Sequence, residues 1–197
     1  HLRTRRQRQM CIRDRFVMVF ENKKIIDATV IILTFNEELH IKRLLESIVG
    51  IFESIVIIDS GSTDDTLKIA HGYGVTVKHN KWPGDHASQL NWAIDNINIT
   101  TKWVFRIDAD EVLSDDVIVE LGIKLKNTSP SIGGFEMKRG NIFLGKKIKY
   151  GGTFPTNIIR IWKTGKARCD GRLMDERMII DDDCLLYTSP SPRDKTV

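Results

Sequence analysis

The chain carries the stretch Trp103-Val-Phe-Arg-Ile-Asp108-Ala-Asp110-Glu111, which begins as a mostly apolar run and ends in acidic residues. We expect a strand that leaves a sheet here, with Asp108 and Asp110 on one side, because side chains two positions apart along a strand share a face. Two carboxylates this close raise each other's pKa unless a cation or strong donors lie between them. The pair therefore indicates a divalent-metal site. The alternative is an acidic turn that caps the next helix.

Strand-like and helix-like segments alternate on both sides of this stretch. Apolar strand patterns fall at 28–33, 54–58 and 75–78, and shorter β-like runs follow Pro130 at 134–138, 141–144 and 157–162. The expected helices run from a cap at Asn36 to Gly50, from a cap at Thr63 or Asp64 to Ala70, over 86–96, and from a cap at Ser114 to 126. Repeated βαβ units predict an α/β fold with a doubly wound, mostly parallel sheet and a small β-rich C-terminal portion.

The two ends of the chain differ in amino-acid composition from the rest. Residues 1–15 contain six arginines without an amphipathic period, and residues 184–197 join a short apolar patch to a Ser-Pro tract. Both resemble translated sequencing adapters, so we expect non-native tails at 1–15 and 184–197 around one domain at 16–183. A genuine basic arm for nucleic acid or anionic lipid is the alternative for the first tail.

Removing these tails changes the charge balance. The 197 residues include 30 Lys+Arg and 26 Asp+Glu, for a net charge of +4. Eight of the basic and two of the acidic residues lie in the tails, so 22 and 24 remain and the domain carries −2. A nucleic-acid partner therefore loses its main support. Outside the tails only Cys169 remains, which excludes a disulfide framework and fits the reducing cytoplasm. No apolar run is long enough to span a bilayer.

Polar clusters follow three of the expected strands. They are Thr34-Phe-Asn36-Glu37, Asp59-Ser-Gly-Ser-Thr-Asp64 and Asp108-Ala-Asp110. Ligands of doubly wound sheets bind at the carboxyl ends of the strands, so we expect the clusters to form one site. Asp59 can accept from a uracil imide or from ribose hydroxyls, and the loop after it supplies backbone N–H groups near a helix start. The chain has neither the dinucleotide-binding nor the P-loop glycine motif.

Together these motifs resemble family 2 glycosyltransferases with the GT-A fold, in particular bacterial members that build lipopolysaccharide core and other surface polysaccharides. The resemblance covers about residues 28–183. It is carried by Thr34-Phe-Asn36-Glu37-Glu38, Asp59-Ser-Gly-Ser-Thr-Asp64-Asp65-Thr66, Trp82-Pro-Gly84, Gln89-Leu-Asn91, Asp108-Ala-Asp110-Glu111, Arg139-Gly-Asn141 and Phe143-Leu-Gly145. It implies a nucleotide-sugar half at about 28–126, an acceptor-side half at about 127–183, and a truncated C-terminal portion.

The resemblance also implies an inverting transfer from a nucleoside-diphosphate sugar, with a UDP-sugar as the first expectation, to a glycan or glycolipid hydroxyl. The implied nucleotide-sugar-binding residues are Thr34, Asn36, Glu37, Asp59, Ser62 and Asp108, and the implied Mg²⁺ or Mn²⁺ ligands are Asp110 and Asp108. Glu176 is the expected catalytic base and Asp175 the second choice, where family members commonly carry a His-Glu pair. Arg160 matches a family position without an assigned role. We expect a cytoplasmic protein, with peripheral attachment to the inner face of the membrane left open.

Other interpretations share part of this pattern. Asp108-Ala-Asp110-Glu-Val112-Leu113 satisfies the signature of haloacid-dehalogenase-type phosphatases, in which Asp108 would be the nucleophile. That motif normally ends the first strand, whereas three expected strands precede it here, and the clusters at Asn36 and Asp59 stay unexplained. A nucleotidyltransferase would share the acidic pair but usually opens with a Gly-rich basic loop, which is absent. A fragment that binds nucleotide sugar without turnover is the remaining alternative. His40, His71, His79 and His86 show no ligand spacing, and we expect them on the surface or in packing.

Overall fold

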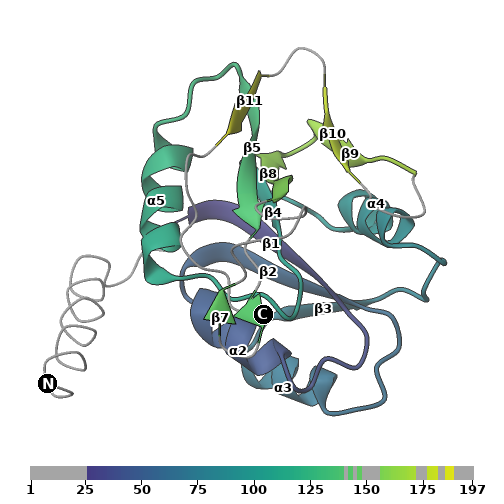
Figure 1. Ribbon diagram of the computed structural model, residues 1–197. Coiled ribbons are helices and arrows are strands. Elements are labelled where there is room, and N and C mark those ends of the chain that lie inside the picture. The colour runs from purple at the N-terminus through teal and green to yellow at the C-terminus, as the bar shows by residue number, and fades with distance from the viewer. Residues whose placement is uncertain are drawn as a thin grey trace, which may run out of the picture.

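A computed structural model of the protein describes residues 26–139, 142–143, 146–147, 156–171, 177–181 and 185–188. Its main strands are β1 (Ile26–Thr34), β2 (Phe52–Asp59), β3 (Thr76–His79), β4 (Trp103–Arg106), β5 (Ile132–Arg139), β8 (Thr156–Lys163) and β11 (Leu185–Thr188). They form one seven-stranded sheet in the order β11-β5-β8-β4-β1-β2-β3 (Figure 1). Within it β8 is antiparallel to both of its neighbours, and the other neighbouring strands of this sheet pair in parallel. The expected mostly parallel α/β sheet is confirmed.

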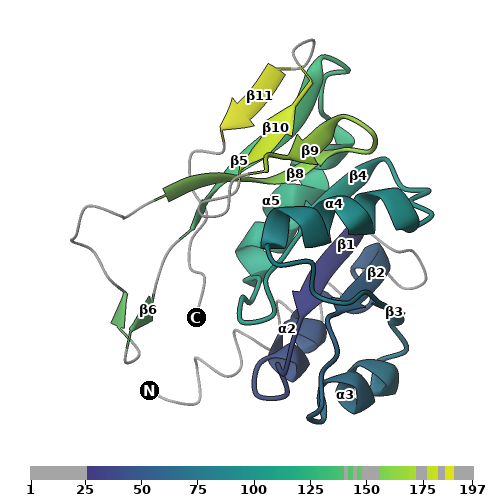
Figure 2. The same ribbon diagram turned by 90° about the vertical axis from the view of Figure 1, so that its right-hand side faces the viewer.

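Helices cover both faces of the sheet. The described helices are α2 (Ile41–Ile48), α3 (Thr66–Gly72), α4 (His86–Asn96) and α5 (Asp115–Lys126). Figures 1 and 2 show α2 and α5 on one face and α4 on the other. None of the helices in the described part of the chain is long and apolar enough to cross a membrane.

The central strands are apolar on both sides because both of their faces are covered. Along β1, Val30 and Ile32 pack into the core with α2 and α5, whereas Ile31 packs into the core with α4. The same division separates Ile57 from Ile58 on β2. This alternation explains why the strand patterns read as continuous β-branched runs and not as alternating apolar and polar residues.

Two small hairpins accompany the main sheet. They are formed by β6 (Ile142–Phe143) with β7 (Lys146–Lys147), and by β9 (Ala167–Cys169) with β10 (Met178–Ile180). Asn91 on α4 holds β9 through its side-chain amide: Nδ2 donates to the Cys169 carbonyl and Oδ1 accepts from the Cys169 N–H, both at 2.9 Å. The expected β-rich C-terminal portion is therefore present.

The C-terminal edge of the sheet includes part of one expected tail, and the division of the chain at 16–183 stays a prediction. Leu185–Thr188 lies inside the segment that we expected to be a non-native tail, yet it forms β11 and pairs in parallel with β5. The tail at 1–15 lies outside the described residues.

Candidate functional site

The first two polar clusters meet because β1 and β2 are parallel neighbours. Thr34 and Asp59 are register partners at the ends of these strands, and the Ser60 N–H donates to the Thr34 carbonyl at 2.9 Å. On the other side of β1, the Ile107 N–H donates to the Ile31 carbonyl at 3.2 Å just beyond β4. The three predicted clusters therefore lie at the same edge of the sheet, as expected for a doubly wound fold.

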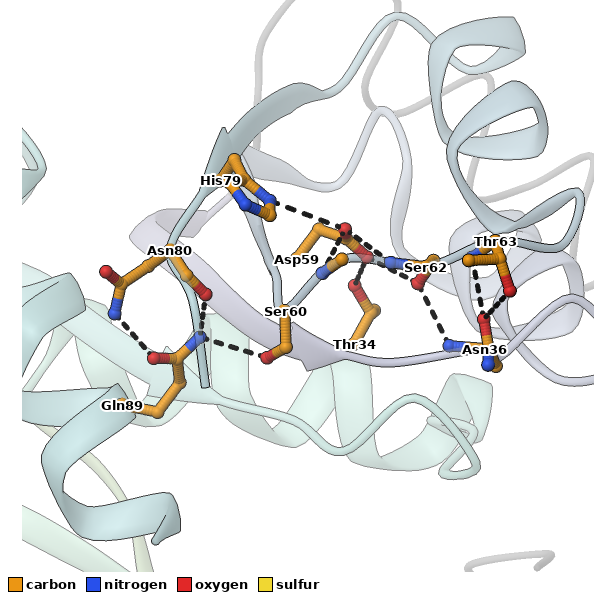
Figure 3. Close-up of polar contacts among 10 residues, drawn as sticks. Thr34, Asn36, Asp59, Ser60, Ser62, Thr63, His79, Asn80 and Gln89 are labelled. Atoms are coloured by element: carbon orange, nitrogen blue, oxygen red, sulfur yellow. Dashed lines mark hydrogen bonds and ion pairs between the residues drawn. The ribbon is translucent and has the colours of Figure 1, made fainter. Parts of the chain in front are cut away.

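Asp59 is a buried hub for the loop that follows β2, with 1% of its surface exposed. Its Oδ2 accepts from the N–H groups of Gly61 at 2.8 Å and Ser62 at 2.9 Å, and its Oδ1 accepts from the hydroxyls of Ser62 and Thr34 (Figure 3). Burial alone would raise the pKa of Asp59, but these hydrogen bonds outweigh it and hold the pKa below its ordinary value. The side chain is a fixed carboxylate that shapes the loop.

Asn36 links the loop after β1 to the loop after β2. Its backbone N–H donates to Ser62 Oγ at 2.9 Å, and its side-chain Oδ1 accepts from the Thr63 N–H at 2.8 Å (Figure 3). Asn36 adopts a left-handed backbone with φ +55°, a conformation that asparagine tolerates better than most residues. The expectation that Asn36 caps a helix is wrong, because α2 begins only at Ile41.

Further hydrogen bonds join the same two loops. The Glu37 N–H donates to Thr66 Oγ1 at 2.7 Å, the Glu38 N–H donates to Asp64 Oδ2 at 3.1 Å, and Glu38 Oε2 accepts from the Asp65 N–H at 3.0 Å. Asp64 Oδ1 also accepts from the N–H of Thr66, the first residue of α3. Together with Asn36, Ser62 and Thr63, eight residues of the two motifs thus fix the loops to each other.

Two residues from the third strand and α4 complete this region. Gln89 is fully buried on α4, where its Nε2 donates to Ser60 Oγ and to the Asn80 carbonyl, both at 3.1 Å (Figure 3). His79 Nδ1 lies 3.8 Å from Asp59 Oδ2, with 66% of the histidine side chain exposed. We expected His79 to be a surface or packing residue. It is exposed, but it lies at the edge of the candidate site.

The acidic motif is a turn and not a strand end. β4 stops at Arg106, so the argument that Asp108 and Asp110 share a strand face does not apply. Glu111 closes the turn, because its N–H donates to the Asp108 carbonyl at 3.0 Å while its Oε2 accepts from the Asp108 N–H at 3.2 Å. The Asp108 carboxylate is bound by Arg160, whose Nη2 lies 2.6 Å from Oδ2, and Arg106 Nε lies 3.4 Å from Oδ1.

Asp110 stands in a different electrostatic setting. Burial raises its pKa, and the negative charges of Asp108, Glu111 and Glu37 raise it further. Arg43 donates to the Asp110 backbone carbonyl at 3.2 Å, not to its carboxylate. Among the residues that the structure describes, no ion pair neutralises this carboxylate. Among the acids of the turn, Asp110 is therefore the one whose negative charge a bound cation would stabilise most.

A complete metal-binding cluster is not formed by the described side chains alone. Within these ranges no group of three or more His, Cys, Asp or Glu residues is arranged to hold a metal ion. Glu37 is close enough for its charge to reach Asp110, but its Oε2 is paired with His40 Nδ1 at 2.9 Å. The chemistry of the turn nevertheless fits a hard divalent cation, because such ions take carboxylate oxygens and complete their shells with ligand oxygens and water.

The expected bases, Asp175 and Glu176, lie outside the described residues and stay predictions. The residues that flank them are fixed: the Asp170 N–H donates to the Arg177 carbonyl at 2.8 Å, and the Arg177 N–H donates to Asp170 Oδ1 at 2.7 Å. Sequence reasoning gave no role to Glu111, Gln89 and Arg160. Glu111 belongs to the Asp108-Ala-Asp110-Glu111 motif, but its buried position, with 3% of its surface exposed, could not be read from the sequence.

Comparison with known proteins identifies the family of the chain. Residues 29–187 match the model of glycosyl transferase family 2. A lipopolysaccharide core biosynthesis glycosyltransferase, LpsC of Rhizobium meliloti (strain 1021), is 34% identical over 149 residues, which are 71% of this chain and 52% of that protein. The glycosyltransferase SunS of Bacillus subtilis (strain 168) is 36% identical over 87 residues, covering 43% of this chain and 20% of SunS. The chain thus spans about half the length of LpsC.

Solved structures share the fold. The crystal structure of S. aureus TarS 1–349 superposes with a TM-score of 0.51 at 20% identity, covering 71% of this chain and 47% of that one. A second TarS structure gives a TM-score of 0.54 at 19% identity, covering 71% of this chain and 28% of that one. The family match extends over most of the described sheet, from β1 to β11, and includes all three polar clusters. The chain belongs to glycosyl transferase family 2.

Proposed function

We propose that this domain is the catalytic domain of an inverting glycosyltransferase that uses a nucleoside-diphosphate sugar and a divalent cation. The observation that carries the proposal is the edge where β1, β2 and β4 end, with a closed hydrogen-bonded pair of loops beside an under-neutralised Asp110. A divalent cation would supply the positive charge that this edge lacks, and the diphosphate would supply further oxygen ligands for the cation.

The nucleoside would lie against the loops after β1 and β2. We assign Thr34, Asn36, Glu37, Asp59 and Ser62 to this half of the site, as the resemblance implies. A carboxylate has about four lone-pair positions, and Asp59 already accepts four hydrogen bonds from its own loop and Thr34. Asp59 would therefore act mainly by fixing the conformation of the loop. An N–H group of the nucleobase could bind Asp59 only by sharing an oxygen with one of these donors or by displacing it.

The diphosphate would lie over the acidic turn. Asp110 would hold Mg²⁺ or Mn²⁺, and Asp108, fixed by Arg160, would face the ribose or a water on the cation. When bound, the cation would neutralise charge that develops on the leaving diphosphate. Because neither aspartate completes a cation site alone, nucleotide and metal would bind together.

The acceptor would approach from the C-terminal portion. Direct displacement at the anomeric carbon requires a base for the acceptor hydroxyl, and Glu176 is our first candidate with Asp175 second. We propose a glycan or glycolipid of the bacterial surface as acceptor, since a relative at 34% identity is named for lipopolysaccharide core biosynthesis. A cytoplasmic location with contact to the inner membrane face would suit such an acceptor.

Calorimetry with the whole chain tests the donor half. UDP should bind in the presence of Mn²⁺ and much more weakly with EDTA, and GDP and CDP serve as base controls. Absence of metal-dependent binding with every nucleotide would refute the proposal. Binding without UDP release from any UDP-sugar would favour the second candidate, a nucleotide-sugar-binding domain without turnover in this form.

The phosphatase interpretation receives no support from the family match. The structure adds a physical objection, because the Asp108 carboxylate is engaged by Arg160 at 2.6 Å and is poorly suited to act as a nucleophile. Hydrolysis of p-nitrophenyl phosphate that disappears in Asp108→Asn would be needed to revive it.

A further inference from the structure

Arg160 reaches the acidic turn from the antiparallel strand β8. Phe105 on β4 pairs with Ile161, so the preceding residue, Arg160, lies opposite the point where β4 ends. On the other side of β8, Phe135 pairs with Ile161 but Glu136 pairs with Ile159, which leaves Arg160 as the extra residue of a bulge. Bulges re-aim a side chain relative to the regular pleat. The local backbone therefore directs an arginine to this site.

A single guanidinium nitrogen joins two carboxylates. Arg160 Nη2 lies 2.6 Å from Asp108 Oδ2 and 2.9 Å from Glu111 Oε1. Glu111 in turn accepts from the Asp108 N–H through its other oxygen. The three residues form a closed ring in which both the main chain and the side chain of Asp108 are fixed.

Two members of this ring, Arg160 and Glu111, are buried at a cost in desolvation free energy. Only 4% of the Arg160 side chain and 3% of the Glu111 side chain are exposed. Arg160 Nε is also buried and makes no hydrogen bond within the described residues. Apolar side chains of similar volume often replace buried ion pairs without loss of stability. Packing alone therefore gives no reason for this arrangement, and a positioning role does.

We infer that Arg160 and Glu111 are positioning residues that fix Asp108 and offset its charge, so that the cation site is built on Asp110, binds a bare cation weakly and becomes tight only with the nucleotide diphosphate. The inference rests on the proposed function. It follows from the charge balance, because Arg160, alongside Arg106 at 3.4 Å from Asp108 Oδ1, offsets part of the negative charge of three neighbouring carboxylates and so weakens their attraction for a bare cation. The same positive charge favours the diphosphate.

Replacement of the arginine should change two affinities in opposite directions. We expect Arg160→Met to bind Mn²⁺ alone about threefold to tenfold more tightly, measured by electron paramagnetic resonance of free Mn²⁺. UDP at saturating Mn²⁺ should bind more weakly by a similar factor, measured by calorimetry. Arg168→Met is the matched control, because Arg168 forms an exposed ion pair with Asp95 on α4, and both affinities should stay unchanged.

The outcomes separate this inference from the proposed function. If the wild type fails to bind UDP with Mn²⁺, the proposed function fails. If it binds but Arg160→Met matches it in both affinities, or loses both with circular dichroism intact, the positioning role is overturned. Should Arg160→Met not fold, Glu111→Gln decides: it removes one negative charge and should weaken binding of Mn²⁺ alone by about threefold or more. Unchanged Mn²⁺ affinity in Glu111→Gln would equally overturn the inference.

Discussion

The two halves of the candidate site handle buried charge in opposite ways. In the loops after β1 and β2, the Asp59 carboxylate is surrounded by neutral donors and is stabilised as an anion. In the turn after β4, the Asp110 carboxylate is surrounded by other acids and is destabilised as an anion. The first arrangement is complete without a ligand, whereas the second is completed only by a positive charge from outside the described residues. The difference separates residues that build the site from residues that act in it.

The largest effect should come from the incomplete half. We expect Asp110→Asn to lower sugar transfer by about 10²- to 10³-fold, because it removes the carboxylate that would bind the cation next to developing charge. UDP binding should also lose its dependence on Mn²⁺. The variant should be at least as stable as the wild type in metal-free buffer, since it removes a carboxylate whose charge the fold disfavours. A clear loss of stability would show that Asp110 belongs to the scaffold instead.

Asp59→Asn should have the reverse profile. The amide replaces one acceptor oxygen by a donor that faces the N–H groups or hydroxyls of the loop, which leaves buried donors unsatisfied. We expect a loss of about 2 kcal/mol in the free energy of unfolding, measured in urea. Asp95→Asn, which breaks only an exposed ion pair with Arg168, is the control and should change stability by less than about 1 kcal/mol. Equal effects of both variants would contradict a hub role for Asp59.

Acid should abolish the difference in stability between the wild type and Asp59→Asn. The pKa of Asp59 is lowered in the fold from an ordinary value of 3.8. Its stabilising contribution is therefore fully present above pH 3.8 and is lost as the pH falls from there through the lower pKa of the folded state. The stability gap between the wild type and Asp59→Asn should shrink over this range, measured by urea unfolding at each pH. If the difference in unfolding free energy between the two proteins stays constant down to acid unfolding, the negative charge of Asp59 does not stabilise the loop.

The contrast between the halves also marks what could be predicted from sequence. The sheet and the edge at which the clusters meet were predictable, because β-branched runs and strand ends are local features of the sequence. Glu111 and Arg160 were not, because their roles depend on β8 meeting β4 across 49 residues of chain. Asn36 was mistaken for a helix cap, since its bond to Thr63 joins residues from different loops. A sequence motif does not distinguish residues that contact a ligand from residues that hold the loops in place.

The smallest effect is expected at Asn36, where two substitutions separate the backbone and side-chain contributions to stability. Asn36→Ala loses the hydrogen bond to Thr63 and keeps an unfavourable left-handed backbone, so we expect a loss of about 1–2 kcal/mol. Asn36→Gly loses the same bond but relieves the backbone, and should cost less by about 1 kcal/mol. Urea unfolding measures both. If the two variants are equally stable, φ at this position is not a cost to the fold. If in addition they bind UDP with Mn²⁺ as the wild type does, Asn36 is neither strained nor a ligand contact, and its place in the nucleotide half is lost.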